Sequence, residues 1–372
     1  MTGAFSLAAA CSSHLASTPM ARLTKEPFGQ TPDGQAIDIV TLRNLKSMEV
    51  RIMTYGGIIV SLRVPDRAGQ VDDVVLGHDD AAGYFNNSPF LGALIGRYGN
   101  RIAKGKFTLD GHDYTLATNN APNHLHGGTK GWNQAVWEAE PFQDVRGVGV
   151  VMSHTSPDGD EGYPGTVKAS VTYTLTDNNE LKVEYSATTD KPTIINLTQH
   201  SYFNLGGTKT PDILTHQLQI NADRYTPVDE TLIPTGELAL VAGTPFDFRQ
   251  ATAIGARIEQ ADEQLTRGKG YDHNWVLNRS GDGMSPAASA FEPQSGRTLD
   301  ISTTEPGIQF YSGNFLDGTL MGKGGRPLAH RSGFCLETQH YPDSPNHPTF
   351  PSTVVRPGTP YHTTTVFKFG AR

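Results

Sequence analysis

Short runs of alternating apolar and polar residues, each ended by turn residues, make up most of this chain. The segments 36–44 (AIDIVTLRN) and 49–65 (EVRIMTYGGIIVSLRVP) alternate as half-buried β-strands do. The segments 105–117 and 166–190 each read as two strands joined by a short turn. The 40 glycines and 24 prolines are spread evenly as turn residues and mark no domain boundary. The pattern predicts one large antiparallel all-β domain with two stacked sheets.

Helical periodicity is scarce, and the segment 250–265 (QATAIGARIEQADEQL) is where the sequence predicts a helix. The folded domain is expected to cover residues 28–372. Residues 1–27 are expected to form a leader or a disordered tail. Small residues before Cys11 resemble the end of a bacterial lipoprotein leader, although the basic start of such a leader is lacking. The compartment therefore stays open between the cytoplasm and a lipid-anchored position in the periplasm.

Charge and composition exclude several classes of function. The net charge of −8 is spread without blocks, so the chain has no electrostatic footprint for nucleic acid or an anionic membrane. No apolar stretch is long enough to span a bilayer. Neither a phosphate-binding loop nor a dinucleotide fingerprint is present, and we therefore expect no cofactor. Two cysteines in different contexts do not indicate a disulfide framework.

A glutamate lies in the middle of the apolar stretch 334–341 (FCLETQHY). In a strand, Cys335, Glu337 and Gln339 share one face, while Leu336 and Thr338 share the other. If both faces are covered, Glu337 is a carboxyl group out of bulk water and needs a partner or a function. If one face is wet, Glu337 is an ordinary surface residue.

The segment 193–207 (TIINLTQHSYFNLGG) also has two different faces if it forms a strand. Its apolar residues would point into a core. The opposite face would carry hydrogen-bonding groups, among them Asn196, His200 and Tyr202. This composition suits a ligand cleft, but periodicity alone slightly favours a solvated sheet face with a satisfied histidine.

Two histidines, His124 and His126, are separated by one residue before a Gly-Gly turn. Such a pair can bind a metal ion if a third ligand converges on it. Alternatively, the loop presents one imidazole to a ligand. Most pairs of this kind are structural, so we expect no metal site here.

Three further segments contain polar residues that are candidates for a functional site. Arg97, Asn100 and Arg101 lie between glycines, and long polar groups on a tight loop suit sugar hydroxyls or a carboxylate. Asp272 and Gln309 belong to other strand-like segments. Together these segments provide neutral donors and acceptors with a few carboxyl and imidazole groups. That inventory favours a neutral polyol and acid–base chemistry.

Six of these motifs occur in an order that resembles the aldose 1-epimerases, the galactose mutarotases. They are GRYGNRI, NHLHGG, NLTQHSYFNLGG, YDHNW, QFYSGNFLDG and ETQHYPDSPNHP. The resemblance extends from about Phe28 to the C-terminus. It implies a single-domain β-supersandwich that binds a monosaccharide in a cleft on one sheet. The resemblance implies no metal and no cofactor, and it leaves the oligomeric state open.

The resemblance also implies roles for individual residues. Glu337 matches the catalytic base of the family, and His200 matches its general acid. The expected substrate-binding residues are Asn100, Arg101, Arg97, His126, Asp272, Gln309 and Tyr202. The base takes a proton from the anomeric hydroxyl and the acid protonates the ring oxygen, so the sugar opens and recloses as its other anomer. We expect burial to raise the pKa of Glu337. We also expect the nearby carboxylate of Asp272 to keep His200 protonated.

Other functions remain as alternatives at this point. A glycoside hydrolase would use Asp272 and Glu337 as its carboxyl pair. A sugar-binding protein would keep the cleft without catalysing a reaction. An epimerase of hexose phosphates would need a basic pocket. A metal enzyme built on His124 and His126 would lose activity on chelation. Glucose, galactose, xylose and arabinose all remain open as the preferred aldose.

Overall fold

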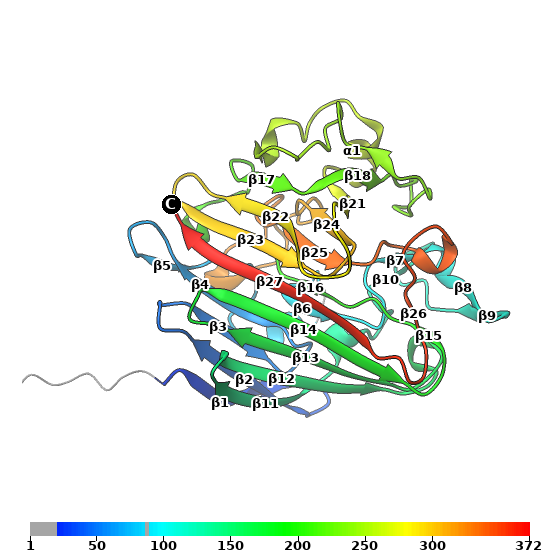
Figure 1. Ribbon diagram of the computed structural model, residues 1–372. Helices are drawn as coiled ribbons and strands as arrows, with labels where there is room; N and C mark the ends of the chain where they lie inside the picture. The colour runs from blue at the N-terminus through cyan, green and yellow to red at the C-terminus, as the bar shows by residue number, and fades with distance from the viewer. Residues whose placement is uncertain (1–20, 86–88) are drawn as a thin grey trace, which may run out of the picture.

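A computed structural model describes residues 21–85 and 89–372 of the chain. Its largest element is a nine-stranded antiparallel sheet, which crosses the whole molecule in Figure 1. In spatial order its strands are β11 (Glu138–Asp144), β12 (Gly147–Ser156), β13 (Val167–Leu175), β14 (Glu180–Thr189), β27 (Tyr361–Ala371), β23 (Arg297–Thr303), β22 (Ser285–Phe291), β17 (Gln217–Ile220) and β20 (Thr252–Ala253).

Two five-stranded sheets form the facing layer. The first contains, in order, β1 (Leu23–Gln30), β2 (Ala36–Arg43), β3 (Glu49–Met53), β4 (Ile59–Pro65) and β5 (Val71–Asp73). The second contains, in order, β19 (Ala239–Leu240), β18 (Ala222–Thr226), β21 (Asp272–Leu277), β24 (Gly307–Tyr311) and β25 (Cys335–Gln339). Isolated bridges from Phe203 to Val75 and to Phe334 connect the β5 edge of the first sheet with the β25 edge of the second.

The two layers enclose one large hydrophobic core. Strands β13 and β14 alternate between buried and partly exposed residues, as their sequence predicted. Val171 of the nine-stranded sheet belongs to the same apolar cluster as Val50 and Leu62 of the facing layer. Burial of a side chain of this size is worth about 1.5–3 kcal/mol. The prediction of a large antiparallel all-β domain is confirmed.

In the described part of the chain, four short strand pairs lie outside the three large sheets. They are β6 (Ala93–Ile95) with β16 (Thr198–His200), β7 (Arg101–Ile102) with β10 (His124–Leu125), β8 (Lys106–Leu109) with β9 (His112–Thr115), and β15 (Thr193–Ile194) with β26 (Val354–Val355). The hairpins predicted in segments 105–117 and 166–190 are β8–β9 and β13–β14. The segment 193–207 is not one strand, because its parts pair with different partners, but its apolar residues do enter the core.

The helix predicted over residues 250–265 is wrong for most of its length. The helix α1 covers Glu263–Gly268, so it overlaps only the last three residues of the predicted segment. The Asp262 side chain caps its start by accepting hydrogen bonds from the backbone N–H groups of Gln264 and Leu265. Earlier in the segment, β20 pairs with β17. Edge pairing to a large sheet therefore overrides the local helical preference. The 3-10 turns are η1 (Ala82–Tyr84), η2 (Ala103–Gly105), η3 (Trp132–Gln134), η4 (Asp160–Gly162), η5 (Gly207–Lys209), η6 (Ile254–Ala256), η7 (Lys323–Gly325) and η8 (Ser344–Asn346).

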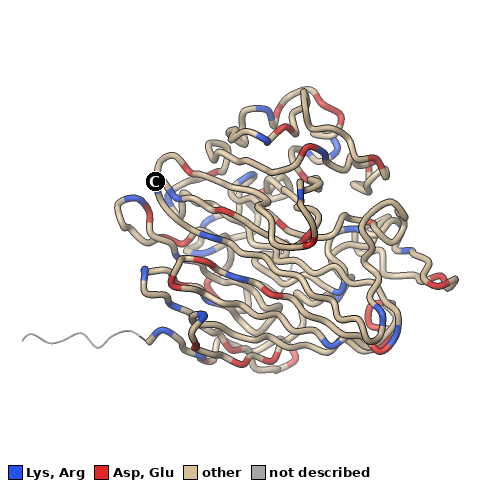
Figure 2. The backbone as a smooth tube through the Cα atoms, viewed as in Figure 1, with Lys and Arg blue, Asp and Glu red and all other residues tan. Residues whose placement is uncertain are grey.

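The N-terminal part of the fold begins before residue 28, because β1 starts at Leu23 and pairs with β2. The proposed leader up to residue 20, including Cys11, lies outside the described residues. Acidic and basic residues are interspersed along the backbone in Figure 2, without a long run of one sign. None of the helices in the described ranges has the length and apolarity needed to cross a bilayer.

Candidate active site

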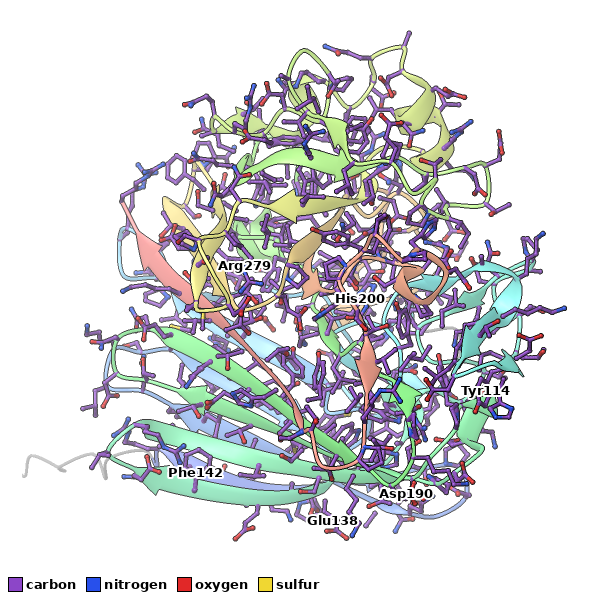
Figure 3. All side chains as sticks on the ribbon, turned by 45° about the vertical axis from the view of Figure 1, so that its right-hand side comes forward. Tyr114, Glu138, Phe142, Asp190, His200 and Arg279 are labelled. Carbon is purple, nitrogen blue, oxygen red and sulfur yellow. The ribbon has the colours of Figure 1, made fainter. Side chains whose placement is uncertain are left out.

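A pocket of about 510 Å³ opens where the β21–β24–β25 strands meet β16 and the loops around β7 and β10. Seven of the nine sequence-predicted site residues line it: Asn100, Arg101, His126, His200, Tyr202, Asp272 and Glu337. Arg97 and Gln309 do not. Figure 3 shows His200 in the interior of the molecule, far from edge residues such as Tyr114 and Phe142. The structure therefore gathers most of the predicted set around one cavity.

Glu337 lies at the centre of β25, whose five residues are all buried. Only 2% of its surface is exposed, so both faces of the strand are covered. Its backbone pairs with Gln309 on β24, which fixes the carboxyl group on a rigid element. Burial raises the pKa of Glu337 well above its usual value, and the nearby Asp272 carboxyl raises it further. This glutamate is an interior acid, as the first of the two sequence interpretations required.

His200 contacts Glu337 from the end of β16. Its Nε2 lies 3.7 Å from Oε1 of Glu337, and 4% of the residue is exposed. Burial lowers the pKa of His200 to about 4, and hydrogen bonding to its own carbonyl only partly offsets this. The expectation that Asp272 keeps His200 protonated is therefore wrong, because Asp272 acts on Glu337 and burial dominates at His200. Burial therefore disfavours the charged form of each group, the carboxylate of Glu337 and the imidazolium of His200.

His126 presents a hydrogen-bond donor to the pocket. Burial lowers its pKa well below the usual value, with further lowering by His200 and Arg101, so the ring is neutral. The Asn100 backbone N–H donates to Nδ1 of His126 at 3.2 Å. A neutral ring that accepts at Nδ1 carries its proton on Nε2.

The same tautomer bears on metal binding. His126, His200 and Glu337 each place a possible ligand atom within 4.8 Å of the others. A metal-bound imidazole normally donates an N–H from its other nitrogen, whereas Nδ1 of His126 accepts one. His124 is directed elsewhere, with Nδ1 against the Ala117 carbonyl and Nε2 against the Tyr163 hydroxyl. The donor set does not fit a metal ion, and the His124–His126 pair does not form a site.

The loop that carries His126 needs a glycine to approach its neighbour. Gly127 has φ of +84°, and a Cβ built there would lie 1.9 Å from the Gly96 carbonyl oxygen. Gly111, in the β8–β9 hairpin, has nearly the same φ of +80°, but a Cβ there would meet nothing within 4 Å. An alanine at either position would suffer the strain of a positive φ, but only an alanine at Gly127 would also collide with a neighbouring backbone.

We expect Gly127→Ala to lower the free energy of unfolding much more than Gly111→Ala. The control suffers only the strain of a positive φ, about 1–2 kcal/mol. Gly127→Ala must also displace the backbone at Gly96. Its free energy of unfolding should therefore fall by well over this amount, and its sugar turnover should fall as well. Denaturant titration and initial rates of both variants check this. Equal losses of stability would show that the approach of the two loops is not tight.

Asp272 begins β21 and lies under the pocket. Its Oδ1 accepts a hydrogen bond from Nε2 of Gln309 at 2.7 Å, and its Oδ2 lies 3.9 Å from the Arg101 guanidinium. Burial raises the pKa of Asp272, and Arg101 and Gln309 oppose that rise. Gln309 thus stands behind Asp272 and holds it in place, rather than lining the cavity itself.

Arg97 has a different role from the one the sequence suggested. The residue is 2% exposed, and its guanidinium donates to the backbone carbonyls of Ser156, Pro157, Pro164 and Gly165. These bonds use the planar fork to fasten the loop after β12, away from the pocket. The expectation of a sugar contact from Arg97 is not met in this structure, because Arg97 does not line the pocket and both terminal nitrogens of its guanidinium donate to this loop.

The substitution Arg97→Lys should therefore affect stability, whereas Arg101→Lys should affect sugar binding. Arg97→Lys removes several charged hydrogen bonds, so we expect the free energy of unfolding to fall by about 1–3 kcal/mol with KM unchanged. Arg101→Lys should leave stability nearly intact and raise KM about tenfold, as expected for one charge-assisted hydrogen bond to the sugar. Thermal melts and steady-state kinetics measure both. A raised KM with an unchanged melting temperature in Arg97→Lys would contradict this assignment.

Among the aromatic residues of the pocket, sequence reasoning predicted Tyr202 and missed Phe90 and Phe315. Phe90 adopts φ of +60°, and its ring lies 4.6 Å from that of His126 and 5.9 Å from that of His200. Tyr311 and Phe315 stack at 5.9 Å on another side of the cavity. Phe90 follows a proline in a turn without periodicity, so no pattern indicated its position. The Phe90 ring packs against both imidazoles and helps to bury them, and burial lowers their pKa values.

Comparisons with known proteins agree on one family. A family model described as aldose 1-epimerase matches residues 38–368. The galactose mutarotase of Homo sapiens is 48% identical over 352 residues, which cover 94% of this chain and 99% of that protein. The aldose 1-epimerase of Escherichia coli is 43% identical over 340 residues, which cover 91% of this chain and 96% of that protein.

Solved structures show the same likeness. An aldose epimerase homologue from C. elegans superposes with a TM-score of 0.82 at 31% identity, covering 90% of this chain and 98% of that one. A galactose 1-epimerase from Lactobacillus acidophilus superposes with a TM-score of 0.83 at 29% identity, covering 94% and 98%. The similarity therefore spans the whole sandwich, including the strands that carry the pocket.

Proposed function

The chain belongs to the aldose 1-epimerase family and interconverts the α and β anomers of aldoses, and we propose that Glu337 and His200 carry out the two proton transfers. The observation that carries this assignment is the contact of a buried carboxyl with a buried imidazole, 3.7 Å apart at the wall of one pocket. Two titratable groups held together out of water, with pKa values shifted in opposite directions, are typical of an acid–base pair.

Ring opening uses both groups at once. The Glu337 carboxylate takes the proton of the anomeric hydroxyl, while the His200 imidazolium gives its Nε2 proton to the ring oxygen. The bond between C1 and the ring oxygen breaks, and the electron pair of the O–H bond forms the C1 carbonyl. Each positioned transfer typically contributes about 10²–10⁴ to the rate. After this step Glu337 is a neutral acid and His200 is a neutral imidazole.

Ring closure reverses these transfers on the other carbonyl face. A half-turn about the bond from C1 to C2 exposes that face to the free hydroxyl of the open chain. His200 then accepts the hydroxyl proton, and Glu337 returns its proton to the new anomeric oxygen. Acid and base end in their starting states, so the cycle consumes no cofactor and accelerates both directions by the same factor.

Burial sets which form of the pair the empty pocket favours. The charged form (carboxylate with imidazolium) and the neutral form (acid with imidazole) contain the same number of protons. Low polarity favours the neutral form, which is also the form that accompanies the open-chain sugar. Oε2 of Glu337 has no hydrogen-bond partner among the described residues. A hydroxyl of the bound cyclic sugar would donate to this carboxylate and so favour the charged form needed for opening.

The remaining pocket residues suit a neutral, hydroxyl-rich monosaccharide. The Nε2–H of His126 is a donor for a ring or hydroxyl oxygen, and Arg101 adds a charged donor fork. Asp272 accepts from sugar hydroxyls, with Gln309 holding it in place. Asn100 and Tyr202 complete the polar wall. We propose these residues as the substrate-binding set for aldoses such as D-galactose and D-glucose.

Polarimetry tests the function directly. Freshly dissolved α-D-galactose and α-D-glucose should reach the same final rotation as without enzyme, but much sooner, and pretreatment with EDTA should not slow this. Release of reducing sugar from a galactoside or glucoside would instead indicate the glycoside hydrolase alternative. Tight sugar binding without acceleration would leave only a binding protein.

A further inference from the structure

Cys335 lies directly behind the proposed general acid. It precedes Glu337 by two residues on β25, so both side chains are on the same face of that strand. Its Sγ lies 3.5 Å from Nδ1 of His200, on the ring nitrogen opposite the one that contacts Glu337. The residue is fully buried and does not line the pocket, so the thiol touches the imidazole rather than the sugar.

The proton balance of the pair requires a particular partner at Nδ1. In the charged form His200 has a proton on both nitrogens. In the neutral form Nε2 must have a free electron pair to accept the proton back, so the remaining ring proton is on Nδ1. Nδ1 thus carries a proton at every stage and needs an acceptor at every stage. The backbone carbonyl of His200 itself is one nearby acceptor, and the Cys335 sulfur is the side-chain atom that contacts Nδ1 among the described residues.

We propose that Cys335 is a positioning residue whose sulfur accepts the Nδ1–H of His200, which leaves Nε2 as the nitrogen that exchanges protons with the sugar. This rests on the proposed role of His200 as the acid. The neutral thiol also suits the reaction. Burial raises the pKa of Cys335 well above its usual value, so the group stays uncharged and accepts only weakly. A carboxylate at this point would stabilise the imidazolium and make His200 a poorer acid.

The backbone holds this contact rigidly. Phe334, next to Cys335, and Phe203, three residues after His200, exchange two backbone hydrogen bonds of 2.7 and 2.9 Å. The bridge places the segment before Phe203 alongside β25, so Cys335 and His200 are neighbours on adjacent strands. The aromatic rings of Tyr202 and Phe90 lie 5.1 and 5.9 Å from the imidazole and limit its rotation.

Two variants of nearly equal shape separate hydrogen bonding from packing. Cys335→Thr and Cys335→Val introduce the same branched side chain, but only threonine retains an acceptor. A hydrogen bond of this kind is worth about 0.5–1.5 kcal/mol, which corresponds to roughly two- to tenfold in rate. We expect kcat of the valine variant to lie below that of the threonine variant by about this factor, with KM alike. Equal kcat values, whether high or low, would overturn the proposal.

The tautomer of His200 provides a readout that packing alone would not move. Nitrogen-15 NMR of the imidazole should show the proton on Nδ1 in the wild-type protein and in Cys335→Thr. The valine variant should shift toward the Nε2 tautomer, while its thermal melt stays close to that of the threonine variant. An Nε2 tautomer in the wild-type protein would contradict the proposal. A wild-type protein with the Nδ1 tautomer but no mutarotation would instead count against the proposed function.

Discussion

Glu337→Gln should lower kcat for the anomerisation of α-D-galactose by about 10²–10⁴-fold while changing KM little, because one positioned proton transfer contributes that factor. The amide has the same shape as the carboxyl group and can still hydrogen bond to a sugar hydroxyl. It cannot accept the proton of the anomeric oxygen at any working pH. Polarimetry at saturating sugar measures the loss, and near-normal turnover would remove Glu337 from the reaction.

The same substitution should make the protein more stable at alkaline pH. Burial raises the pKa of Glu337 in the folded protein above its value in the unfolded chain. The buried acid therefore favours folding fully only below the unfolded pKa, and this contribution is lost as pH rises toward the folded value. Glutamine does not titrate, so the advantage of the variant in free energy of unfolding should grow from about pH 4 to pH 8. Denaturant titrations at several pH values check the trend, and a variant that is less stable at pH 8 would contradict it.

His200→Asn should reduce kcat by a similar factor of about 10²–10⁴, again with little change in KM. Asparagine keeps a polar group beside Glu337 but cannot deliver a proton to the ring oxygen. Without the acid, the departing ring oxygen must carry negative charge in a buried site. Steady-state rates across a range of galactose concentrations separate the two parameters. A higher KM at unchanged kcat would make His200 a binding residue instead.

Local patterns were sufficient for much of the fold and for the central acid. Alternation predicted the β13–β14 hairpin and placed Glu337 within a strand, because side-chain direction in a strand follows from sequence position alone. The helix over residues 250–265 failed because the edge of the nine-stranded sheet recruits β20, a contact that no local pattern encodes. Long-range pairing decided the structure of that segment.

The site shows the same division between local and long-range information. Resemblance by motif predicted which residues gather, and seven of them line the pocket. It did not distinguish Arg101, which lines the pocket, from Arg97, whose guanidinium donates to four backbone carbonyls away from the pocket. Nor did it predict the low pKa of His200, because that depends on burial by rings such as Phe90. Hydrogen-bond commitments and solvent exclusion are properties of the assembled fold.

In this mechanism Glu337 and His200 act as one unit, because Glu337 accepts a proton from the sugar in the same step in which His200 donates one to it. The most direct test is kcat of the double variant Glu337→Gln/His200→Asn, compared with both single variants on α-D-galactose. Residues that act as a unit are strongly non-additive, so the double variant should be about as slow as the slower single variant. Losses that multiply, with the double variant slower by the product of both factors, would mean that the two groups act independently and would contradict this mechanism.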